Sequence, residues 1–489
     1  FILRFESMRV LVLLFISLFV FSVACQNGIT ATQLASAIED IIAQPQFDRM
    51  EWGILVEQEL PDSSYQTVYS LNADQYFTPA SNNKVITTAP AYLYLGDDFK
   101  YSTPFVASSS SGKLNNACII GRGDPSIEIS QIQSFVNSLH RSGVESIGTL
   151  TFDDSYFPSF PPAWEWEDVQ DYYGAQPNSL ILSQNAVSIS VSPGDSVGAP
   201  LVFDFGNDAD NACMMVVNNG VTISQSGTIT EPLRVFYRLG DARIYIEGQY
   251  EMGRTPESFT FAALQPADRF GCVFNYYLDQ KNITLKDSAF GRCHNTSTWA
   301  TIGSIDSEYS LIDTMNYTLQ QSDNLFAECF LRTLGAYYKN PNNANAEQNG
   351  FTAVRNILQE NGVDVSTFVQ DDGSGLSRHN LVSPRAMADV LEMMGNTPNG
   401  DTYRSFLPVA GESGTLSSRF QGTPAQGIVE AKTGTMSGVS SLSGYVDASD
   451  VYPQIVFSII TNFSNQSASV ARSGIDDIVV LLTQLIPDN

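Results

Sequence analysis

The chain of 489 residues is poor in basic residues and in histidine. It holds 25 Lys and Arg against 52 Asp and Glu, which gives a formal net charge of -27, and it has three histidines. This charge argues against nucleic acid or an anionic membrane as a partner, because both carry negative charge themselves. The histidines, His140, His294 and His379, form no metal-spaced cluster. We therefore expect no metal site and no cofactor.

The chain also lacks the signature of a hydrolase that uses a Ser-His-Asp triad. No Gly-x-Ser-x-Gly elbow is present, and a triad could only borrow one of the three histidines. His379 lies beside an Asp-Gly-Ser-Gly-Leu-Ser run, but a surface role is favoured for it. Catalysis by a histidine-activated serine is therefore disfavoured.

Long apolar runs are absent after the first residues of the chain. Residues 8–25, MRVLVLLFISLFVFSVAC, combine a short basic start, an apolar run and small residues, which predicts a secretory signal peptide cleaved near Ala24 or Cys25. An uncleaved membrane anchor and a lipid on Cys25 are the alternatives. With residues 1–25 as leader and signal, we expect an exported protein, periplasmic or extracellular, with no stable membrane span after cleavage.

The six cysteines fit an exported protein, and one of them leaves with the signal peptide. Cys272 and Cys293 close a short loop and are the favoured disulfide. Cys118 and Cys213 each follow Asn-Ala in a strand-like segment and are a plausible second pair. Cys329 falls on an apolar helical stripe, which predicts a buried free thiol.

The string SNNK at 81–84 places a serine and a lysine three residues apart. On a helix, Ser81 and Lys84 would share one face, with the hydroxyl near the positive end of the helix dipole. The apolar run that follows predicts a helix ending at Gly96, with a bend at Pro90. Lys84 could take the proton of Ser81 if burial or a nearby cation lowers the pKa of its ammonium group.

The string SDN at 322–324 directly precedes LFAECFLRTLG, whose apolar residues recur at helical spacing. A loop that begins such a helix could direct Ser322 and Asn324 into a cleft, although an ordinary helix cap is the alternative. Further matches to the short motifs occur elsewhere, and context disfavours them: Ser110 to Lys113, Ser70 to Asn72, and Ser183 to Asn185.

The string KTGT at 432–435 lies in GIVEAKTGT, a segment with strand character. Gly434 would let the strand backbone approach a substrate closely. Thr433 and Thr435 offer hydroxyl groups, and Lys432 offers a cation for a substrate carboxylate. An exposed edge strand with a solubilising lysine is the alternative.

The three strings occur together in the order that class A β-lactamases and penicillin-binding proteins share. Beyond them, the chain resembles the class C low-molecular-mass penicillin-binding proteins, which are D-alanyl-D-alanine carboxypeptidase/endopeptidases. The resemblance covers nearly the whole chain after the leader. It rests on PASNNKVITTAPAYLYLG, GRGDPS at 121–126, YYGAQPNSLILSQNAV at 172–187, SDNLFAECFLRTLG, DDGSGLSRHNLVSP at 371–384, and LPVAGESGTLSSRF with the AKTGT and SGYV that follow.

The resemblance implies a role for each residue of the acylation step. Ser81 would attack the carbonyl between two D-alanines and become the acyl-enzyme, with Lys84 as the base. Ser322 would relay a proton, and Lys432 would keep the local field positive. The backbone N–H groups of Ser81 and Thr435 would form the oxyanion hole.

The same resemblance implies how substrate and inhibitor bind. Asn324 would hold an amide of the peptide, while Thr433 and Thr435 would hold the terminal carboxylate beside Gly434. β-Lactams would acylate Ser81 as covalent inhibitors. The expected function is that of a serine D,D-peptidase, a carboxypeptidase or endopeptidase acting on peptidoglycan stem peptides. The alternatives are a β-lactamase and a catalytically silent protein that binds β-lactams or peptidoglycan.

The expected fold class is α+β, with a penicillin-binding, transpeptidase-like catalytic domain whose antiparallel sheet is covered by helices. Its segments are residues 26–103 and 298–489, because the three strings and the flanking helix and strand patterns lie there. Residues 104–297 form a large β-rich insertion. The resemblance implies two nested modules within it, about 104–129 with 206–297, and about 130–205.

Overall fold

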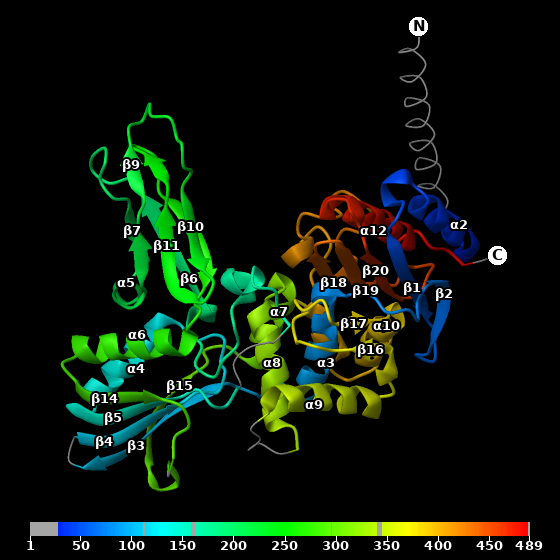
Figure 1. Ribbon diagram of the computed structural model, residues 1–489. Helices are drawn as coiled ribbons and strands as arrows, with labels where there is room; N and C mark the ends of the chain where they lie inside the picture. The colour runs from blue at the N-terminus through cyan, green and yellow to red at the C-terminus, as the bar shows by residue number, and fades with distance from the viewer. Residues whose placement is uncertain (1–27, 111–112, 158–162, 295, 340–344, 488–489) are drawn as a thin grey trace.

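The computed structural model describes residues 28–110, 113–157, 163–294, 296–339 and 345–487. The predicted signal peptide at 8–25 lies outside the described residues. Among the described helices, none is long and apolar enough to cross a membrane. The chain folds into two bodies, one built from the two ends of the chain and the other from its middle (Figure 1).

The body made from both ends of the chain contains a five-stranded antiparallel sheet in the order β18-β19-β20-β1-β2. The sequence patterns predict strands at 51–59 and 65–73, and the second strand ends two residues earlier than expected. The strands are β1 (Glu51–Glu59), β2 (Tyr65–Leu71), β18 (Val429–Met436), β19 (Val439–Val446) and β20 (Ile455–Asn462).

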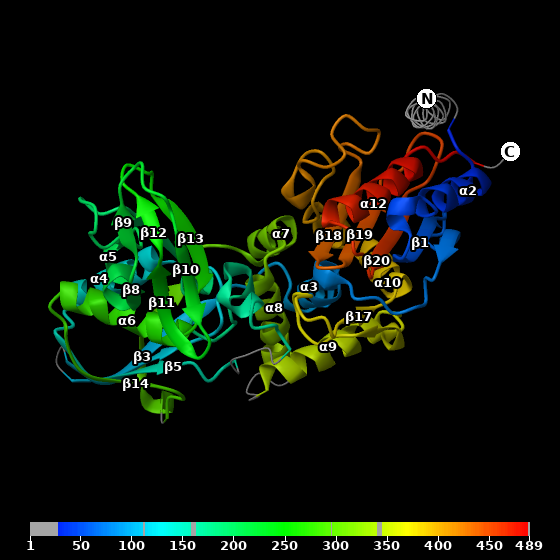
Figure 2. The ribbon, with the colours of Figure 1, turned by 45° about the horizontal axis from the view of Figure 1, so that its top comes forward.

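Helices cover both faces of this sheet, which confirms the predicted fold class. Along β1, Ile54 and Val56 face one hydrophobic core while Leu55 faces the other, as the two-residue period of a strand requires. The first core lies under α2 (Ala31–Ile42) and α12 (Ala468–Leu482), which lie side by side in both views (Figures 1 and 2). The second is covered by α3 (Asn83–Leu95), α7 (Leu311–Gln321), α8 (Asn324–Tyr337), α9 (Ala346–Glu360), α10 (Pro384–Gly395) and α11 (Gly400–Ser405).

Helix α3 is deeply buried in the second core and contacts α7, α8, α9 and α10. Its residues from Asn83 to Tyr92 are all buried, and it ends at Gly96, whose φ is 73°. The helix runs through Pro90, so the bend that we expect there stays a prediction. The residues that follow SNNK are mostly apolar because this part of the helix is buried on every side.

The middle of the chain begins with a mixed sheet in the order β14-β5-β4-β3-β15. Strands β14, β5 and β4 are parallel, while β3 and β15 add antiparallel neighbours. Helices α4 (Ile129–Arg141) and α6 (Pro266–Gln280) pack over one face (Figure 2). The strands are β3 (Ser102–Ser110), β4 (Lys113–Ile120), β5 (Ser146–Asp153), β14 (Thr284–Phe290) and β15 (Ala300–Asp306).

A second group of strands forms three small sheets beside this mixed sheet and has its own apolar core. The strands are β6 (Ala186–Ser192), β7 (Val202–Asp204), β8 (Val216–Asn218), β9 (Val221–Ile223), β10 (Arg234–Arg238), β11 (Asp241–Glu247), β12 (Gln249–Glu251) and β13 (Glu257–Ala262). The predicted inner module, about 130–205, supplies β5 to the mixed sheet and β6 to this group. We therefore propose another division of the insertion, with β6 to β13 as the inner module inside the mixed sheet.

The disulfides differ from the predicted pairs Cys272–Cys293 and Cys118–Cys213. Cys118 is bonded to Cys293 with a Cα–Cα distance of 6.4 Å, and Cys213 to Cys272 with 5.8 Å. The prediction is wrong because closeness in sequence does not decide which cysteines meet. Strands β4 and β14 flank β5, which brings Cys118 near Cys293, three residues after the end of β14, whereas α5 (Asp208–Cys213) packs on α6. Cys329 is a buried free thiol, as predicted.

Three carboxyl groups meet where β1 contacts α10. The carboxylate oxygens of Glu57, Asp389 and Glu392 lie within 4.8 Å of one another, and Arg385 lies 3.7 Å from Glu57. Thr67 also donates a hydrogen bond to Glu57. Burial, followed by the hydrogen bond and charge of Glu57, raises the pKa of Glu392. The folded protein therefore holds a proton on Glu392 at a pH where the unfolded chain would release it.

This cluster makes folding stability depend on pH. A carboxyl group whose pKa is raised on folding contributes its full stabilisation of the folded state at pH values below its unfolded pKa. This stabilisation is lost as the pH rises toward the folded pKa. We expect the Tm to fall between pH 5 and pH 8, and Glu392→Gln to reduce that fall by about 2–4 °C, the shift for about 1 kcal/mol. Thermal unfolding at both pH values measures it. Glu51→Gln, an exposed change on the same strand, is the control; equal falls in both variants would contradict the prediction.

Candidate active site

Ser81 lies on a short 3-10 turn, Ala80–Asn82, immediately before α3. Ala80 has a φ of 50°, in the left-handed region that costs a residue with a Cβ about 1–2 kcal/mol. The Ala80 carbonyl lies so close to Gly375 that a Cβ there would be 1.9 Å from the oxygen. The turn is therefore held by its surroundings, and it leaves Ser81 half-buried.

Lys84 is fully buried in the first turn of α3. Its Nζ donates to Ser81 Oγ at 3.0 Å and to Asn324 Oδ1 at 2.6 Å. A third hydrogen bond, 2.7 Å long, goes to the backbone carbonyl of Ser374. The structure thus brings together the serine and lysine of SNNK and the asparagine of SDN, as the sequence predicts.

Burial lowers the pKa of Lys84 to about 8, because a charged ammonium group loses its hydration in the interior. The carboxylates of Asp372, Asp323 and Glu328 oppose this shift. A neutral amine is therefore accessible near neutral pH, and a neutral amine can accept the proton of Ser81. The pair has the geometry of a nucleophile with its base.

The SDN string forms the junction between α7 and α8. Ser322 ends α7 with a left-handed φ of 60°, and Asp323 begins α8 by accepting a hydrogen bond from the backbone N–H of Phe326 at 2.9 Å. The tight junction turns Ser322 and Asn324 toward the two lysines of the site. The same three residues therefore cap helix α8 and direct Ser322 and Asn324 toward the two lysines.

Lys432 is the second fully buried lysine, on strand β18. Its Nζ donates to Ser322 Oγ at 2.8 Å and to the backbone carbonyl of Thr433 at 2.8 Å. Burial, with a smaller contribution from the charge of Lys84, lowers the pKa of Lys432 well below its ordinary value. The charge of Lys84 thus disfavours a charge on Lys432, whereas the pKa of Lys84 itself is lowered by burial.

Gly434 allows β18 to lie directly against the turn that carries Ser81. A Cβ at this position would be 2.2 Å from Ser441 Oγ and 2.6 Å from the carbonyl oxygen of Pro79. Ser441 in turn donates to Pro79 O at 2.7 Å, and Asn82 Nδ2 donates to Ser443 Oγ at 2.8 Å. Strands β18 and β19 therefore hold the turn in place by hydrogen bonds. The close approach of β18 to the turn is possible because Gly434 has no side chain.

The threonines of KTGT alternate with Lys432 and Gly434 along β18. Thr433 is hydrogen-bonded through Oγ1 to Thr415 Oγ1 at 2.8 Å, and Thr435 is exposed beyond it. Thr415 belongs to the LPVAGESGTLSSRF segment, and no motif singled it out. Both KTGT hydroxyls lie on one face of the strand, as its two-residue period requires.

The DGSGLS segment contributes a residue that motif reading missed, because the contact uses its backbone. The Ser374 carbonyl that binds Lys84 is positioned by Glu328 on α8, whose Oε1 accepts the N–H groups of Gly373 and Ser374, both at 2.8 Å. Glu328 is paired with the equally buried Arg332 at 2.6 Å. Burial and Asp372 raise the pKa of Glu328 to about 7.

The inserted region reaches the site through Trp164. Its indole N–H donates to Asp372 Oδ2 at 2.9 Å, within the DGSGLS segment. The same carboxylate accepts the N–H groups of Gly375 and Ser377, both at 2.6 Å, and the amide of Asn380 at 2.9 Å. Asp372 therefore ties the insertion to the loop that orients Lys84.

Two more contacts place the insertion beside these site residues. Asn324 Nδ2 donates to the backbone carbonyl of Tyr173 at 2.8 Å. Arg378, which follows DGSGLS, lies 3.3 Å from Glu165 and donates to the carbonyl of Ser437 at 3.1 Å. The insertion carries none of the three strings, yet it forms part of the wall around them.

The other matches to the short motifs lie away from this site. Ser110 and Lys113 are paired across the ends of β3 and β4 instead of sharing a helix face. The remaining pairs are also in other elements: Ser70 to Asn72 at the end of β2, and Ser183 to Asn185 in a 3-10 turn before β6.

The chain matches known proteins over nearly its whole length. The model of a family described as the D-Ala-D-Ala carboxypeptidase 3 (S13) family matches residues 34–485. Penicillin-sensitive carboxypeptidase A of Dictyostelium discoideum is 34% identical over 466 residues, covering 89% of this chain and 88% of that protein. A D-alanyl-D-alanine carboxypeptidase of Actinomadura sp. (strain R39) is 30% identical over 481 residues, covering 95% and 87%.

A solved structure supports the fold independently. The crystal structure of penicillin binding protein 4 from Haemophilus influenzae superimposes with a TM-score of 0.78. It is 24% identical in sequence, and the match covers 91% of this chain and 98% of that one. The arrangement of a helix-covered sheet with a large insertion is therefore shared.

The pKa of Lys84 predicts how the reactivity of Ser81 depends on pH. The rate of acylation by p-nitrophenyl acetate should rise with pH through about 8, because neutral Lys84 accepts the serine proton. Lys84→Met should lower the rate by about 10²–10⁴-fold and abolish the rise. Stopped-flow release of nitrophenol measures both. Lys339→Met, at an exposed lysine, is the control, and a flat profile in the wild type would refute the assignment of the base.

The close contact at Gly434 predicts a sharp effect of one methyl group. Gly434→Ala should push β18 away from the Ser81 turn and lower the acylation rate by about a hundredfold, because a misplacement of 1 Å has that cost. Circular dichroism should show a retained fold. Gly395→Ala is the matched control, since its Cβ would meet its nearest neighbour at 3.4 Å. Similar rates for both variants would contradict the prediction.

Proposed function

The chain belongs to the D-Ala-D-Ala carboxypeptidase 3 (S13) family, and we propose that Ser81 is the nucleophile with which it cleaves the D-Ala-D-Ala bond of peptidoglycan stem peptides. The protein is a serine carboxypeptidase of this family. The observation that carries the assignment of Ser81 is the 3.0 Å hydrogen bond from a fully buried lysine, Lys84, to its hydroxyl.

In the proposed acylation step, Ser81 Oγ attacks the carbonyl carbon between the two D-alanines while Lys84 accepts its proton. The proton then passes to the amine of the departing D-alanine, with Ser322 as the relay. Ser322 suits this role because its hydroxyl accepts a hydrogen bond from Lys432 at 2.8 Å, which directs its own hydrogen elsewhere. Water hydrolyses the acyl-enzyme in the second half of the reaction.

The proposed oxyanion hole consists of the backbone N–H groups of Ser81 and Thr435. Gly434 supports this proposal, because the absence of a side chain brings β18 against the turn that carries Ser81. Two N–H donors fixed on rigid elements stabilise the negative charge that develops on the carbonyl oxygen.

The remaining site residues bind the substrate in this proposal. Asn324 donates one N–H to Tyr173 O, and an amide has a second N–H that can bind a peptide carbonyl. Thr433 and Thr435 would bind the terminal carboxylate with their hydroxyls, in the positive field of Lys432. The charge of that lysine is partly lost through burial, so the carboxylate itself would favour its protonated form.

We further propose that β-lactams acylate Ser81 and that the protein works outside the cytosol. The Dictyostelium relative is named as penicillin-sensitive, which supports the first point. The disulfides and the predicted signal peptide support export. The β-lactamase alternative is not favoured, because the family model and the relatives are those of carboxypeptidases.

The proposal predicts which serine a fluorescent penicillin labels. The wild type should take up label and release D-alanine from a peptide ending in D-Ala-D-Ala, and Ser81→Ala should do neither. Gel fluorescence and a D-amino acid oxidase assay measure the two activities. Ser110→Ala, in the second Ser-x-x-Lys match, is the control and should keep both. Labelling of Ser81→Ala would overturn the assignment, and labelling without D-alanine release would favour the silent binding protein.

A further inference from the structure

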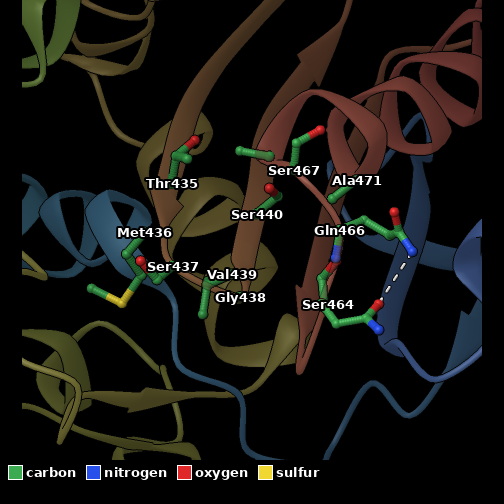
Figure 3. Close-up of a pocket in the computed structure, with 12 residues that line it drawn as sticks. Thr435, Met436, Ser437, Gly438, Val439, Ser440, Ser464, Gln466, Ser467 and Ala471 are labelled. Atoms are coloured by element: carbon green, nitrogen blue, oxygen red, sulfur yellow. Dashed lines mark hydrogen bonds between the residues drawn. The ribbon is translucent and has the colours of Figure 1, made fainter.

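A cleft of about 550 Å³ lies between the end of the β18–β19 hairpin and the start of α12. Thr435 and Ser440 line it from the two strands, and Ser464, Ser467 and Ala468 line it from the segment that enters the helix. Figure 3 shows the side chains of Thr435, Ser440 and Ser467 around this cleft. No motif in the sequence points to it.

The cleft adjoins the proposed site of the terminal carboxylate. Thr435 is shared by both, and Ser440 is its direct partner in the register of β18 and β19. Thr433 lies on the same face of β18 as Thr435, two residues back. A substrate whose carboxylate binds these threonines therefore has its C-terminal residue next to the cleft, because Thr435 belongs to both.

The lining offers hydrogen-bond donors without charge. Ser440 is 1% exposed, and its hydroxyl has no hydrogen-bond partner among the described residues. Ser467 begins α12 without capping it through its side chain, and its hydroxyl is hydrogen-bonded to Ser469 instead at 2.8 Å. The N–H groups of Val470 and Ala471 donate to the carbonyl of Ser467, but those of Ala468 and Ser469 have no partner among the described residues and are open to an acceptor. None of the described lining residues is ionisable.

We propose that this cleft is a leaving-group subsite, which binds the part of a cross-linked stem peptide that lies beyond the released D-centre. The inference rests on the proposed function. The bond that breaks joins the acyl carbonyl carbon to the amine nitrogen of the leaving residue, and the proton from Ser81 ends on that amine. When the leaving residue is D-alanine, its side chain is only a methyl group, which does not occupy the cleft. When its side chain continues into a second stem peptide, the cleft receives that chain.

The chemistry of the lining fits such a chain better than it fits a free ion. A peptide continuation has neutral amide carbonyls, which the hydroxyl of Ser440 and the open N–H groups of α12 can bind. Among the described residues that line the cleft there is no lysine or arginine for a second carboxylate and no acid for an amine. It therefore favours a leaving group whose side chain continues as uncharged amides over a single D-amino acid.

The test compares two substrates that share the acyl part. One is an uncross-linked stem pentapeptide, which releases D-alanine, and the other is a cross-linked dimer, which releases a second stem peptide. Ala468→Trp fills the cleft and should lower the ratio of kcat/KM for the dimer over that for the pentapeptide by at least about tenfold. Ser473→Trp, exposed one turn further along α12 and outside the cleft, should leave the ratio unchanged.

Ser440→Ala is the second variant, which decides the matter if Ala468→Trp does not fold. Removing one buried donor should lower the same ratio by about two- to tenfold. An unchanged ratio in the folded variants, or a wild type that cleaves the pentapeptide but not the dimer, would overturn the subsite and leave the proposed function standing. A wild type that releases no D-alanine from the pentapeptide would instead overturn the proposed function.

Discussion

The burial of Lys84 is the constraint on which the rest of the site depends. A lysine with no exposed surface keeps its place only if its amine has hydrogen-bond acceptors, and here Ser81, Asn324 and Ser374 supply them. The same burial lowers its pKa to about 8, so the group that must be held is also the group that can accept a proton. The burial of Lys84 therefore explains both the hydrogen bonds that hold its amine and its proposed role as the base.

The buried amine in turn requires an ordered shell around it. Glu328, paired with Arg332 inside the protein, holds the loop whose carbonyl binds Lys84. Asp372 ties that loop to Trp164, so the inserted region helps to position a group in the catalytic body. Buried charges of both signs are tolerated because each has partners at hydrogen-bond distance. The insertion is thus part of the site and not only an appendage to it.

The sequence could predict the residues that chemistry demands by type. The serine, the two lysines and the asparagine of the three strings do meet, because SNNK opens a helix, SDN joins two helices and KTGT lies on a strand. The sequence could not predict site groups that act through the backbone or as buried hydrogen-bond partners of the site residues. Ser374 acts through a carbonyl, which every residue has, and Glu328 and Thr415 carry side chains that are common at any surface.

The sequence by itself determined the three strings, the α+β class, the free thiol at Cys329 and a sheet built from both ends of the chain. Those features follow from residue type and from periodicity along the chain. Only the tertiary structure decided that Cys118 meets Cys293, that Trp164 reaches the site, and that a cleft opens beside Thr435. Each of these depends on which distant segments pack together, and pairing across a sheet or between helices leaves no local pattern in the sequence.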